Sequence, residues 1–208
     1  MKLRPAIRDI VVRIASIVTS PLWIAVRLSA RVDRRDNLFL ACSQFLSLFP
    51  GLPGIFLRRG FYRMCADDVA LDCTIEFGTW LAHRRVEIGR RVYIGGRCTI
   101  AACSIGEDTL IGSNVDLVAG RHTHRFDDAE RPICDQPVEF RQIRIGRNVW
   151  IGNSAVVMND VGDGAVIGAG SVVVKPIPAG TVAAGNPCTV KKTCRTASSR
   201  DLAEPCHF

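Results

Sequence analysis

A six-residue pattern of apolar and small residues runs through the second half of the chain. Each unit has an aliphatic residue, a small residue that is usually Gly, two variable positions, a small or β-branched residue and one more variable position. The clear units begin at Ile88, Ile94, Ile105, Ile111, Ile145, Ile151, Val161 and Ile167, and a weaker one, IEFGTW, begins at Ile75. This spacing fits neither the period of an amphipathic helix nor the alternation of an ordinary strand.

The pattern instead predicts short strands and turns wound into a coil. The aliphatic residue would point inward, and Gly, Asn or Asp would let the backbone turn. Three units would close one triangular coil, and coils would stack about 4.8 Å apart with their backbones paired. We therefore predict a mainly β fold, a parallel β-helix with a core of stacked Ile and Val. A β-sandwich would have strands of more varied spacing.

The repeat is interrupted once, and the interruption carries candidate chemistry. From Leu117 to Gln142 the chain reads LVAGRHTHRFDDAERPICDQPVEFRQ, and the hexapeptides resume after it. Two of the four histidines, His122 and His124, lie in this stretch. Imidazole titrates near neutral pH, so either side chain could act as a general base. His83 and His207 lie outside any motif, and we interpret them as structural or incidental.

The N-terminal segment, residues 1–68, follows a helical pattern instead. We expect one helix from Asp9 to Ser29, interrupted at Pro21, and a second from Leu38 to Phe49, capped in front by Asp36-Asn37. The sequence FPGLPG is expected to end the second helix. The uncharged run around this helix is long, but its Pro and Gly residues leave too short a helix to span a membrane.

Charge separates the two parts of the chain. Residues 1–63 hold eleven Lys and Arg against three Asp, whereas the remainder holds sixteen basic and seventeen acidic residues. The basic character therefore belongs to the N-terminal segment, and we expect no nucleic-acid partner. Trp23, the arginines and the apolar faces suggest that residues 1–60 make a peripheral membrane contact or pack on the β-helix of a neighbouring subunit.

Cysteine usage points to a reducing compartment. Nine cysteines are present, none in a CxxC pair, and several are scattered among aliphatics. We expect reduced, mostly buried thiols and a cytoplasmic protein, with contact to the inner face of the membrane as an option. No short apolar run before a small-residue cleavage site is apparent, so a cleaved secretory signal is not expected. The polar tail, residues 193–208, is expected to be loose.

Several motifs together resemble one family. The hexapeptide units, the His-bearing loop 119–142, VWIG at Val149–Gly152 and the closing IGAGSVVVKPIPAGTVAAGNP look like the left-handed β-helix acyltransferases. The most similar branch is the sugar O-acetyltransferases, such as the maltose, galactoside and polysaccharide acetyltransferases. The resemblance covers about Ile75 to Lys192. It implies that residues 69–192 form a left-handed β-helix of a homotrimer. Active sites would lie between subunits, with acetyl-CoA along the groove.

The resemblance also implies a base in the loop. It would take the proton from a sugar hydroxyl as the oxygen attacks the thioester, without a covalent acyl-enzyme and without a metal. Counting from the upstream coil places this base at His122. Counting back from Arg131 favours His124, but the longer loop makes that count less reliable, so we choose His122. The other histidine would line the site.

Further residues match positions around the cofactor. The resemblance implies that the small residues Gly152, Ala169 and Gly170 lie beside the pantetheine arm. It also implies that Lys175 and Lys192 face the phosphates of CoA. Trp150 matches the family's Trp, which packs against the loop or ligand. Ordinary solvated lysines and a plain corner aromatic remain alternatives for these last three residues. Donor oxyanion stabilisation would come from a backbone amide of the WIG coil.

The acceptor side departs from the maltose-type pattern. Where those enzymes have Asn before CTI, this chain has Arg97, which suits an anionic or lipid-linked sugar better than maltose or a galactoside. Asp116, just ahead of the loop, and Asp127, within it, could orient the imidazole or bind sugar hydroxyls. We therefore expect an acetyl-CoA-dependent O-acetyltransferase acting on a bacterial surface polysaccharide or its precursor.

Four other functions are alternatives for a β-helix of this kind. A serine acetyltransferase would have a longer helical N-terminal domain and a different His loop. Acetylation of a sugar amine would use the same base and groove. A γ-type carbonic anhydrase needs three histidines around zinc, with a spacing that His122 and His124 do not have. A non-catalytic scaffold would have no reason to keep the His loop together with the closing coil.

Overall fold

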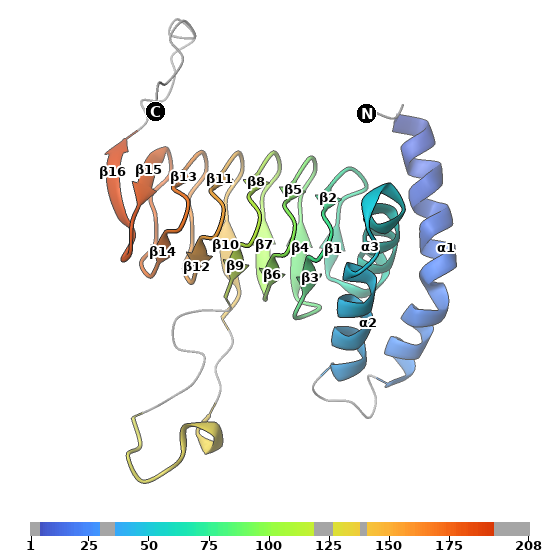
Figure 1. Ribbon diagram of the computed structural model, residues 1–208, viewed down its shortest axis with the longest axis horizontal. Coiled ribbons are helices and arrows are strands. Elements are labelled where there is room, and N and C mark those ends of the chain that lie inside the picture. Colours follow the sequence, from blue (N-terminus) through green and yellow to red (C-terminus); the bar gives the residue numbers. More distant parts are fainter. Residues whose placement is uncertain (1–4, 30–35, 119–126, 138–140, 194–208) are drawn as a thin grey trace, which may run out of the picture.

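The computed structural model describes residues 5–29, 36–118, 127–137 and 141–193. Three helices pack at one end of a left-handed parallel β-helix of about six coils (Figure 1). The helices are α1 (Pro5–Ser29), α2 (Asn37–Ser47) and α3 (Gly51–Cys65). This confirms the predicted fold class, a mainly β solenoid with an N-terminal helical segment.

Three parallel sheets form the sides of the solenoid. Sheet A contains β1 (Asp68–Val69), β4 (Val86–Ile88), β7 (Cys103–Ile105) and β10 (Ile143–Ile145). Sheet B contains β2 (Thr74–Ile75), β5 (Tyr93–Ile94), β8 (Leu110–Ile111), β11 (Trp150–Ile151), β13 (Val166–Ile167), β15 (Thr181–Ala184) and the antiparallel β16 (Thr189–Thr193). Sheet C contains β3 (Trp80–Leu81), β6 (Thr99–Ile100), β9 (Asp116–Leu117), β12 (Val156–Val157) and β14 (Val172–Val173). Isolated bridges at Val161 and Ile177 continue sheet A.

The repeating aliphatics fill the interior, as the hexapeptide pattern predicts. The residues that open the eight clear units are at most 3% exposed, and Ile75 of the weaker unit is fully buried. In-register pairing stacks them directly, for example Ile94 on Ile111 and Ile111 on Ile151. Burial of these side chains in a continuous column is the main stabilising contribution to the solenoid.

The turns between sheets depend on a left-handed residue at the fourth position of each unit. Six non-Gly residues take this conformation at the corners, with φ between 53° and 63°: Arg91, Arg97, Asp108, Asn114, Asn148 and Ser154. Gly78, Gly164, Gly170 and Gly180 occupy the same position in other coils. The hexapeptide is therefore a strand followed by a turn with one positive φ.

The outer faces of the sheets differ in polarity. On sheet A the outward positions include Asp68, Glu87 and Arg144, all exposed. On sheet B, Tyr93, Leu110 and Trp150 lie in register and are 41–50% exposed. Such an exposed apolar ladder is typical of a contact surface, whereas the charged face suits water.

Helix α1 continues without a break past Pro21, so the predicted interruption is wrong. Proline removes the N–H that would bond to the carbonyl four residues earlier, which here belongs to Ile17. The Ser20 hydroxyl donates to that Ile17 carbonyl oxygen at 2.7 Å. The neighbouring side chain therefore supplies the hydrogen bond that the proline cannot make.

The second helix ends at FPGLPG as predicted, since α2 stops at Ser47, but the helix that starts inside this stretch was not predicted. Helix α3 begins within it, with Pro50 as the N-cap and Pro53 in the first turn, where a missing N–H costs nothing. Gly54 is required by packing, because a Cβ there would lie 1.8 Å from the Phe49 carbonyl oxygen. Asp36 precedes α2 but makes no side-chain cap, since its carboxylate pairs with Arg84 instead.

Arg58 joins the helices to the first coil. Its side chain is fully buried and donates to the carbonyl oxygens of Leu46 (3.1 Å), Phe49 (2.8 Å) and Ile75 (3.0 Å). The first two carbonyls lie at the C-terminal end of α2, where a cation also complements the helix dipole. Burial lowers the pKa of this guanidinium.

Most of the described thiols are buried, as the sequence suggested. Cys42, Cys73, Cys98, Cys103 and Cys188 are buried and reduced. Burial raises the pKa of Cys73 to about 11. Such thiols act as small apolar side chains rather than as nucleophiles.

Candidate functional site

Four of the predicted site residues lie on one edge of the solenoid, where the chain turns from sheet B to sheet C; we call it the BC edge. Arg97 is on this edge in the second coil, and Gly152, Ala169 and Gly170 are on it two and three coils further on. Backbone bonds tie the corners together, because from the second coil onward each left-handed residue on this edge donates its N–H to the preceding coil. Arg97 donates to the Phe77 carbonyl at 3.0 Å, and Gly170 to that of Asn153 at 2.9 Å.

The small residues on the BC edge have structural reasons to be small. A Cβ on Gly152 would lie 2.5 Å from the Ala169 amide nitrogen, so stacking of the coils already excludes any side chain there. Gly170 has φ +67°, and a Cβ there would meet nothing within 4 Å. Ala169 and Gly170 are both exposed. The corner therefore presents bare backbone beside open space, which fits a narrow chain such as pantetheine.

The excursion lies on a different edge, where the chain turns from sheet C to sheet A; we call it the CA edge. It starts after Asp116 and Leu117 of β9 and ends before Ile143 of β10. Lys175 is exposed on the same edge, two coils further on. His122 and His124 lie outside the described residues.

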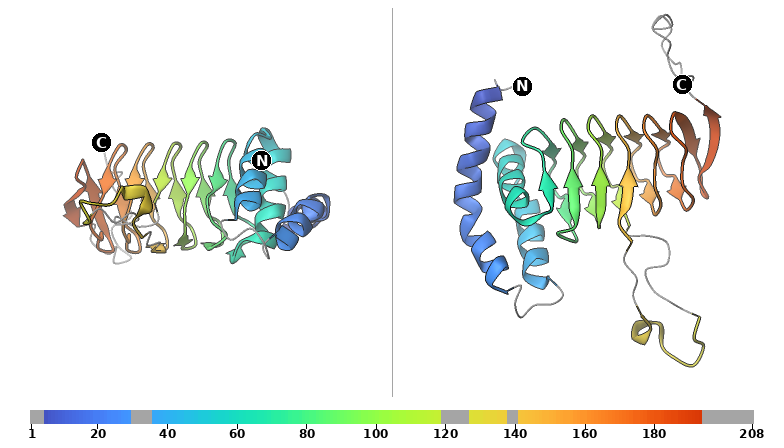
Figure 2. Two further views of the ribbon diagram at one scale, coloured as in Figure 1. Left: turned by 90° about the horizontal axis from the view of Figure 1, so that it is seen from below. Right: turned by 180° about the vertical axis from the view of Figure 1, so that it is seen from behind.

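The described part of the excursion, residues 127–137, protrudes from the body of the solenoid (Figures 1 and 2). It begins at Asp127 and contains one short 3-10 turn, Ile133–Asp135. Gln136 is buried and holds this segment together, since its amide nitrogen donates to the carbonyls of Asp128 (2.9 Å) and Arg131 (3.0 Å). The segment thus has local order of its own while it stands away from the coils.

Trp150 and Lys192 lie on sheet B. Trp150 is 46% exposed in the apolar ladder with Leu110, so it is a strand residue and not a corner aromatic. Lys192 is exposed on β16, opposite Val182 of β15. The amides of Trp150 and Gly152 donate to the carbonyls of Ala165 (3.0 Å) and Ile167 (2.8 Å), so neither N–H is available to an oxyanion.

Sheet C separates the two edges within one chain. Each side of the triangular coil is six residues long, which corresponds to about 15–20 Å of extended backbone. Asp116 projects from this side, between Thr99 and Val156 of the neighbouring coils. One chain therefore does not bring Arg97 and the small corner residues together with the excursion.

A groove of about 590 Å³ follows the outer face of sheet A, but none of the predicted residues lines it. Its charged residues include Arg144 and Asp160. Asp160 accepts from the Arg144 backbone N–H at 2.9 Å and pairs with Arg141 at 2.8 Å. The carboxylate is thus used to hold the coils together, and we do not place the chemistry in this groove.

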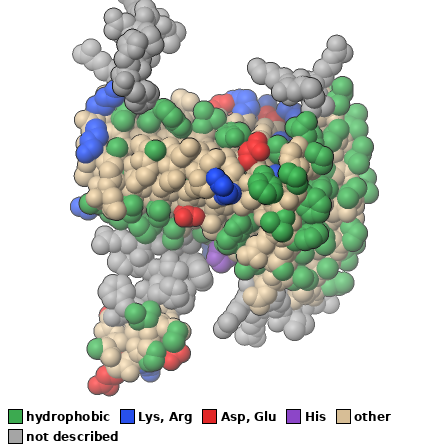
Figure 3. All heavy atoms as spheres, viewed as in Figure 1, with side chains coloured by type: hydrophobic (Ala, Val, Ile, Leu, Met, Phe, Trp, Pro, Cys, Tyr) green, Lys and Arg blue, Asp and Glu red, His purple; other side chains and the backbone are tan. Residues whose placement is uncertain are grey.

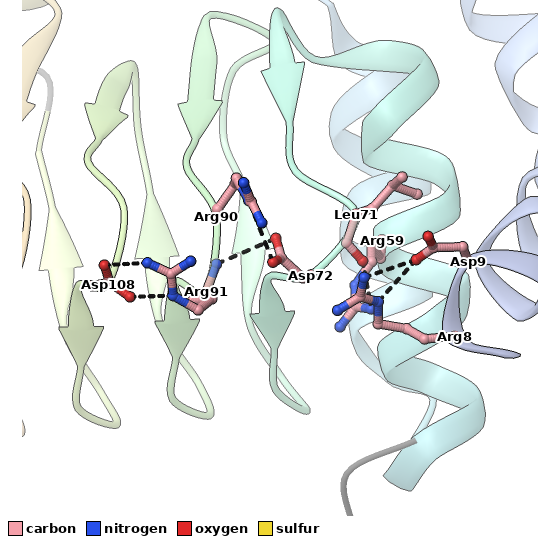
Figure 4. A network of polar contacts seen from close by, with 8 residues as sticks. All are labelled: Arg8, Asp9, Arg59, Leu71, Asp72, Arg90, Arg91 and Asp108. Atoms are coloured by element: carbon pink, nitrogen blue, oxygen red, sulfur yellow. Dashed lines mark hydrogen bonds and ion pairs between the residues drawn. The ribbon is translucent and has the colours of Figure 1, made fainter. Parts of the chain in front are cut away.

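A row of polar contacts follows the remaining edge, between sheets A and B (Figure 4). Arg91 donates to both carboxylate oxygens of Asp108 in the next coil, and Arg90 pairs with Asp72 at 3.7 Å. The Arg91 guanidinium lowers the pKa of Asp108. None of these residues was among the predicted site residues. Their signal in the sequence is charged residues at the third and fourth positions of successive units.

No group of three or more His, Cys, Asp and Glu that could hold a metal ion is found in the ranges that the structure describes.

Two family models match separate parts of the solenoid. "Hexapeptide repeat of succinyl-transferase" matches residues 85–117, and "Bacterial transferase hexapeptide (six repeats)" matches residues 142–175. The excursion lies between the two matched ranges. Both models describe the coil repeat that the sequence analysis identified.

Curated relatives match between half and two thirds of the chain. The galactoside O-acetyltransferase of Escherichia coli K12 is 41% identical over 111 residues, which are 50% of this chain and 52% of the relative. A putative lipopolysaccharide biosynthesis O-acetyl transferase of the same strain is 32% identical over 164 residues, 66% of this chain and 84% of the relative. The chain spans about half the length of the first curated relatives that it matches.

Solved structures share the architecture. A galactoside acetyltransferase in complex with coenzyme A superposes with a TM-score of 0.64 at 28% identity, covering 74% of this chain and 80% of the other. A maltose O-acetyltransferase from Clostridium difficile 630 gives a TM-score of 0.56 at 25% identity, covering 75% and 84%.

Proposed function

Because the chain belongs to the hexapeptide-repeat acetyltransferase family, we propose that it moves an acetyl group from acetyl-CoA to a sugar hydroxyl. The relative matched over most of its length is named for lipopolysaccharide biosynthesis. A neighbour of the same fold was solved with coenzyme A. The first of these names favours a surface polysaccharide or its precursor as the acceptor, and we propose that it is acetylated in the cytoplasm.

The observation that carries the proposal is the division of the candidate site between two edges of one chain. The BC edge offers bare, small corners and Arg97, and the CA edge carries the His-bearing excursion. A cyclic trimer is a closed ring of identical head-to-tail contacts, so it can place the CA edge of one chain beside the BC edge of the next. Three complete sites would then form between three incomplete chains.

The apolar ladder on sheet B supports this assembly. Tyr93, Leu110 and Trp150 are too exposed for a lone subunit and border the BC edge. A neighbour's excursion reaching over that edge would cover them. Ile133 on the excursion is itself 56% exposed and offers an apolar counterpart.

In the proposed reaction, a loop imidazole takes the acceptor hydroxyl proton while the oxygen attacks the thioester carbonyl carbon. A carbon–oxygen bond forms, the carbon–sulfur bond breaks, and the proton passes to the departing CoA sulfur. His122 is the proposed base, with His124 beside it. Lys175 and Lys192 would face the CoA phosphates, Arg97 would bind the acceptor, and Asp116 or Asp127 would orient the imidazole or a sugar hydroxyl.

The test is mass-spectrometric detection of acetyl transfer to a panel of nucleotide sugars, lipid-linked sugars and polysaccharide fragments. His122→Ala is compared with His124→Ala and with the control His83→Ala, which removes an imidazole outside the excursion. We expect His122→Ala alone to lose product while CoA binding, measured by calorimetry, persists. Loss with His124→Ala alone would move the base by two residues. Absence of both product and CoA binding in the wild type would refute the function.

A further inference from the structure

The outer face of α1 is a continuous apolar stripe at the N-terminal end of the molecule. Its large members are 48–72% exposed and recur at helical spacing: Ile7, Ile10, Ile14, Ile17, Val18, Ile24 and Leu28. Figure 3 shows hydrophobic side chains gathered over this end. An exposed stripe of this size on a soluble body indicates a binding surface.

The opposite face of α1 is fixed to the body. Val12, Ala15 and Val26 are buried there. The helix lies so close to α3 that a Cβ on Gly60 would be 2.7 Å from the Ala15 carbonyl carbon. The Ser16 hydroxyl also donates to the Gly60 carbonyl oxygen at 3.3 Å. By length and apolar composition alone, Ala6–Ser29 could cross a membrane, but a spanning helix would have to leave α3.

The charge around the stripe indicates what kind of surface it binds. Arg13 and Arg27 are exposed on one flank of the helix, and the Arg27 guanidinium lies 5.9 Å from the ring centroid of Trp23. The segment 1–63 has eleven basic and three acidic residues. Two such segments placed face to face would repel, so a second copy is disfavoured. An anionic lipid surface complements both the apolar stripe and its basic flank.

The orientation of α1 suits a flat surface. The helix crosses the end of the solenoid roughly at right angles to the solenoid axis (Figures 1 and 2). In a trimer of parallel solenoids the three stripes would face the same way, so that three weak contacts act together. This part of the inference rests on the trimer proposed above.

We propose that the outer face of α1 lies in the interface of an anionic membrane, with its axis parallel to the bilayer and the coils directed away from it. The enzyme would then meet acceptors carried on that membrane.

The test is co-flotation of the purified full-length protein with vesicles of phosphatidylglycerol and phosphatidylcholine, or of phosphatidylcholine alone, without acetyl-CoA. Ile14→Glu/Ile17→Glu places two charges in the stripe. Arg13→Gln/Arg27→Gln removes the basic flank and leaves the apolar stripe and the buried residues of α1 unchanged. The matched control is Val190→Glu, an apolar residue 45% exposed at the other end of the solenoid.

We expect the wild type and Val190→Glu to bind the anionic vesicles. Both double variants should bind them about tenfold or more weakly. Binding should weaken with added salt, since screening shortens the reach of the arginines. Wild-type binding that is absent, or unchanged in both double variants, would overturn the proposal. So would a larger oligomer that the stripe variant dissociates, because a second copy would then be the occupant. CoA binding and acetyl transfer to a soluble acceptor, measured separately, report on the proposed function alone.

Discussion

Substitution of Arg97 can separate the conformational role of a corner residue from its chemical role. The residue has φ 59°, a conformation that disfavours most L-residues by about 1–2 kcal/mol. Its side chain is exposed and leans on Gly78 through its Cγ, while the essential corner bond comes from its backbone N–H. The fold therefore needs the backbone shape at this position and little of the guanidinium.

We expect Arg97→Asn to be as stable as the wild type or more stable by up to about 1 kcal/mol, because Asn tolerates this region. Arg97→Val is the matched contrast. A β-branched residue at positive φ should lower the free energy of unfolding by about 1–2 kcal/mol or more. Both variants lose the same charge, so the difference between them reports the backbone conformation. Equilibrium unfolding in guanidinium, followed by circular dichroism at one protein concentration, measures both variants.

The same variants test the acceptor contact. If the guanidinium binds an anionic acceptor, its loss removes about 1.5–3 kcal/mol, the usual worth of a hydrogen bond to a charged group. The KM for the acceptor should then rise about ten- to hundredfold in Arg97→Asn, while the KM for acetyl-CoA stays unchanged. A destabilised Arg97→Asn would refute the corner argument. An unchanged acceptor KM would remove Arg97 from the acceptor site.

Three further predictions follow from other parts of the molecule. Leu110→Glu, on the apolar ladder, should shift the proposed trimer toward monomer in light scattering, whereas Ser104→Glu on sheet A should not; the same oligomeric state in both variants would contradict the proposed contact. Arg58→Met should lower the free energy of unfolding by about 2–4 kcal/mol, because buried carbonyls lose their donor. An unfolding free energy equal to that of the wild type in guanidinium chloride would show that water replaces the guanidinium group as donor. The Arg147 backbone N–H lowers the pKa of Asp163, so this carboxylate stabilises the fold above its unfolded pKa and less as the pH falls through its folded pKa. Asp163→Asn should therefore flatten the acid side of the stability profile, and an unchanged slope between the wild type and the variant would count against this contact.

The solenoid could be predicted from the sequence because one residue in each unit decides it. Ile94 and Ile111 stack in the core simply because they recur in register, and the corner positions follow from the same count. The helical end was harder to predict, since Pro21 breaks a helix only if nothing else satisfies the Ile17 carbonyl. That Ser20 would do so depends on a rotamer, which no pattern of residue types reveals.

The site could be predicted only as a list of positions. The sequence assigned Gly152 and Gly170 to the cofactor, whereas coil stacking at Gly152 and a positive φ at Gly170 already favour glycine without any ligand. It could not show that Arg97 and the excursion lie on different edges. That division arises from the winding of the chain, and it becomes meaningful only when a second chain is placed beside the first.

The stacked coils also give the molecule an adjustable height. Three coils, β1 to β9, stand between the helices and the start of the excursion, and each adds about 4.8 Å along the axis. Because every coil presents the same two faces to its neighbours, insertion or deletion of one whole coil would move the reaction centre by that step and leave its corners intact. Under the proposed membrane contact, the solenoid would act as a spacer that evolution, or a designer, can lengthen in fixed increments to match how far an acceptor projects from the membrane.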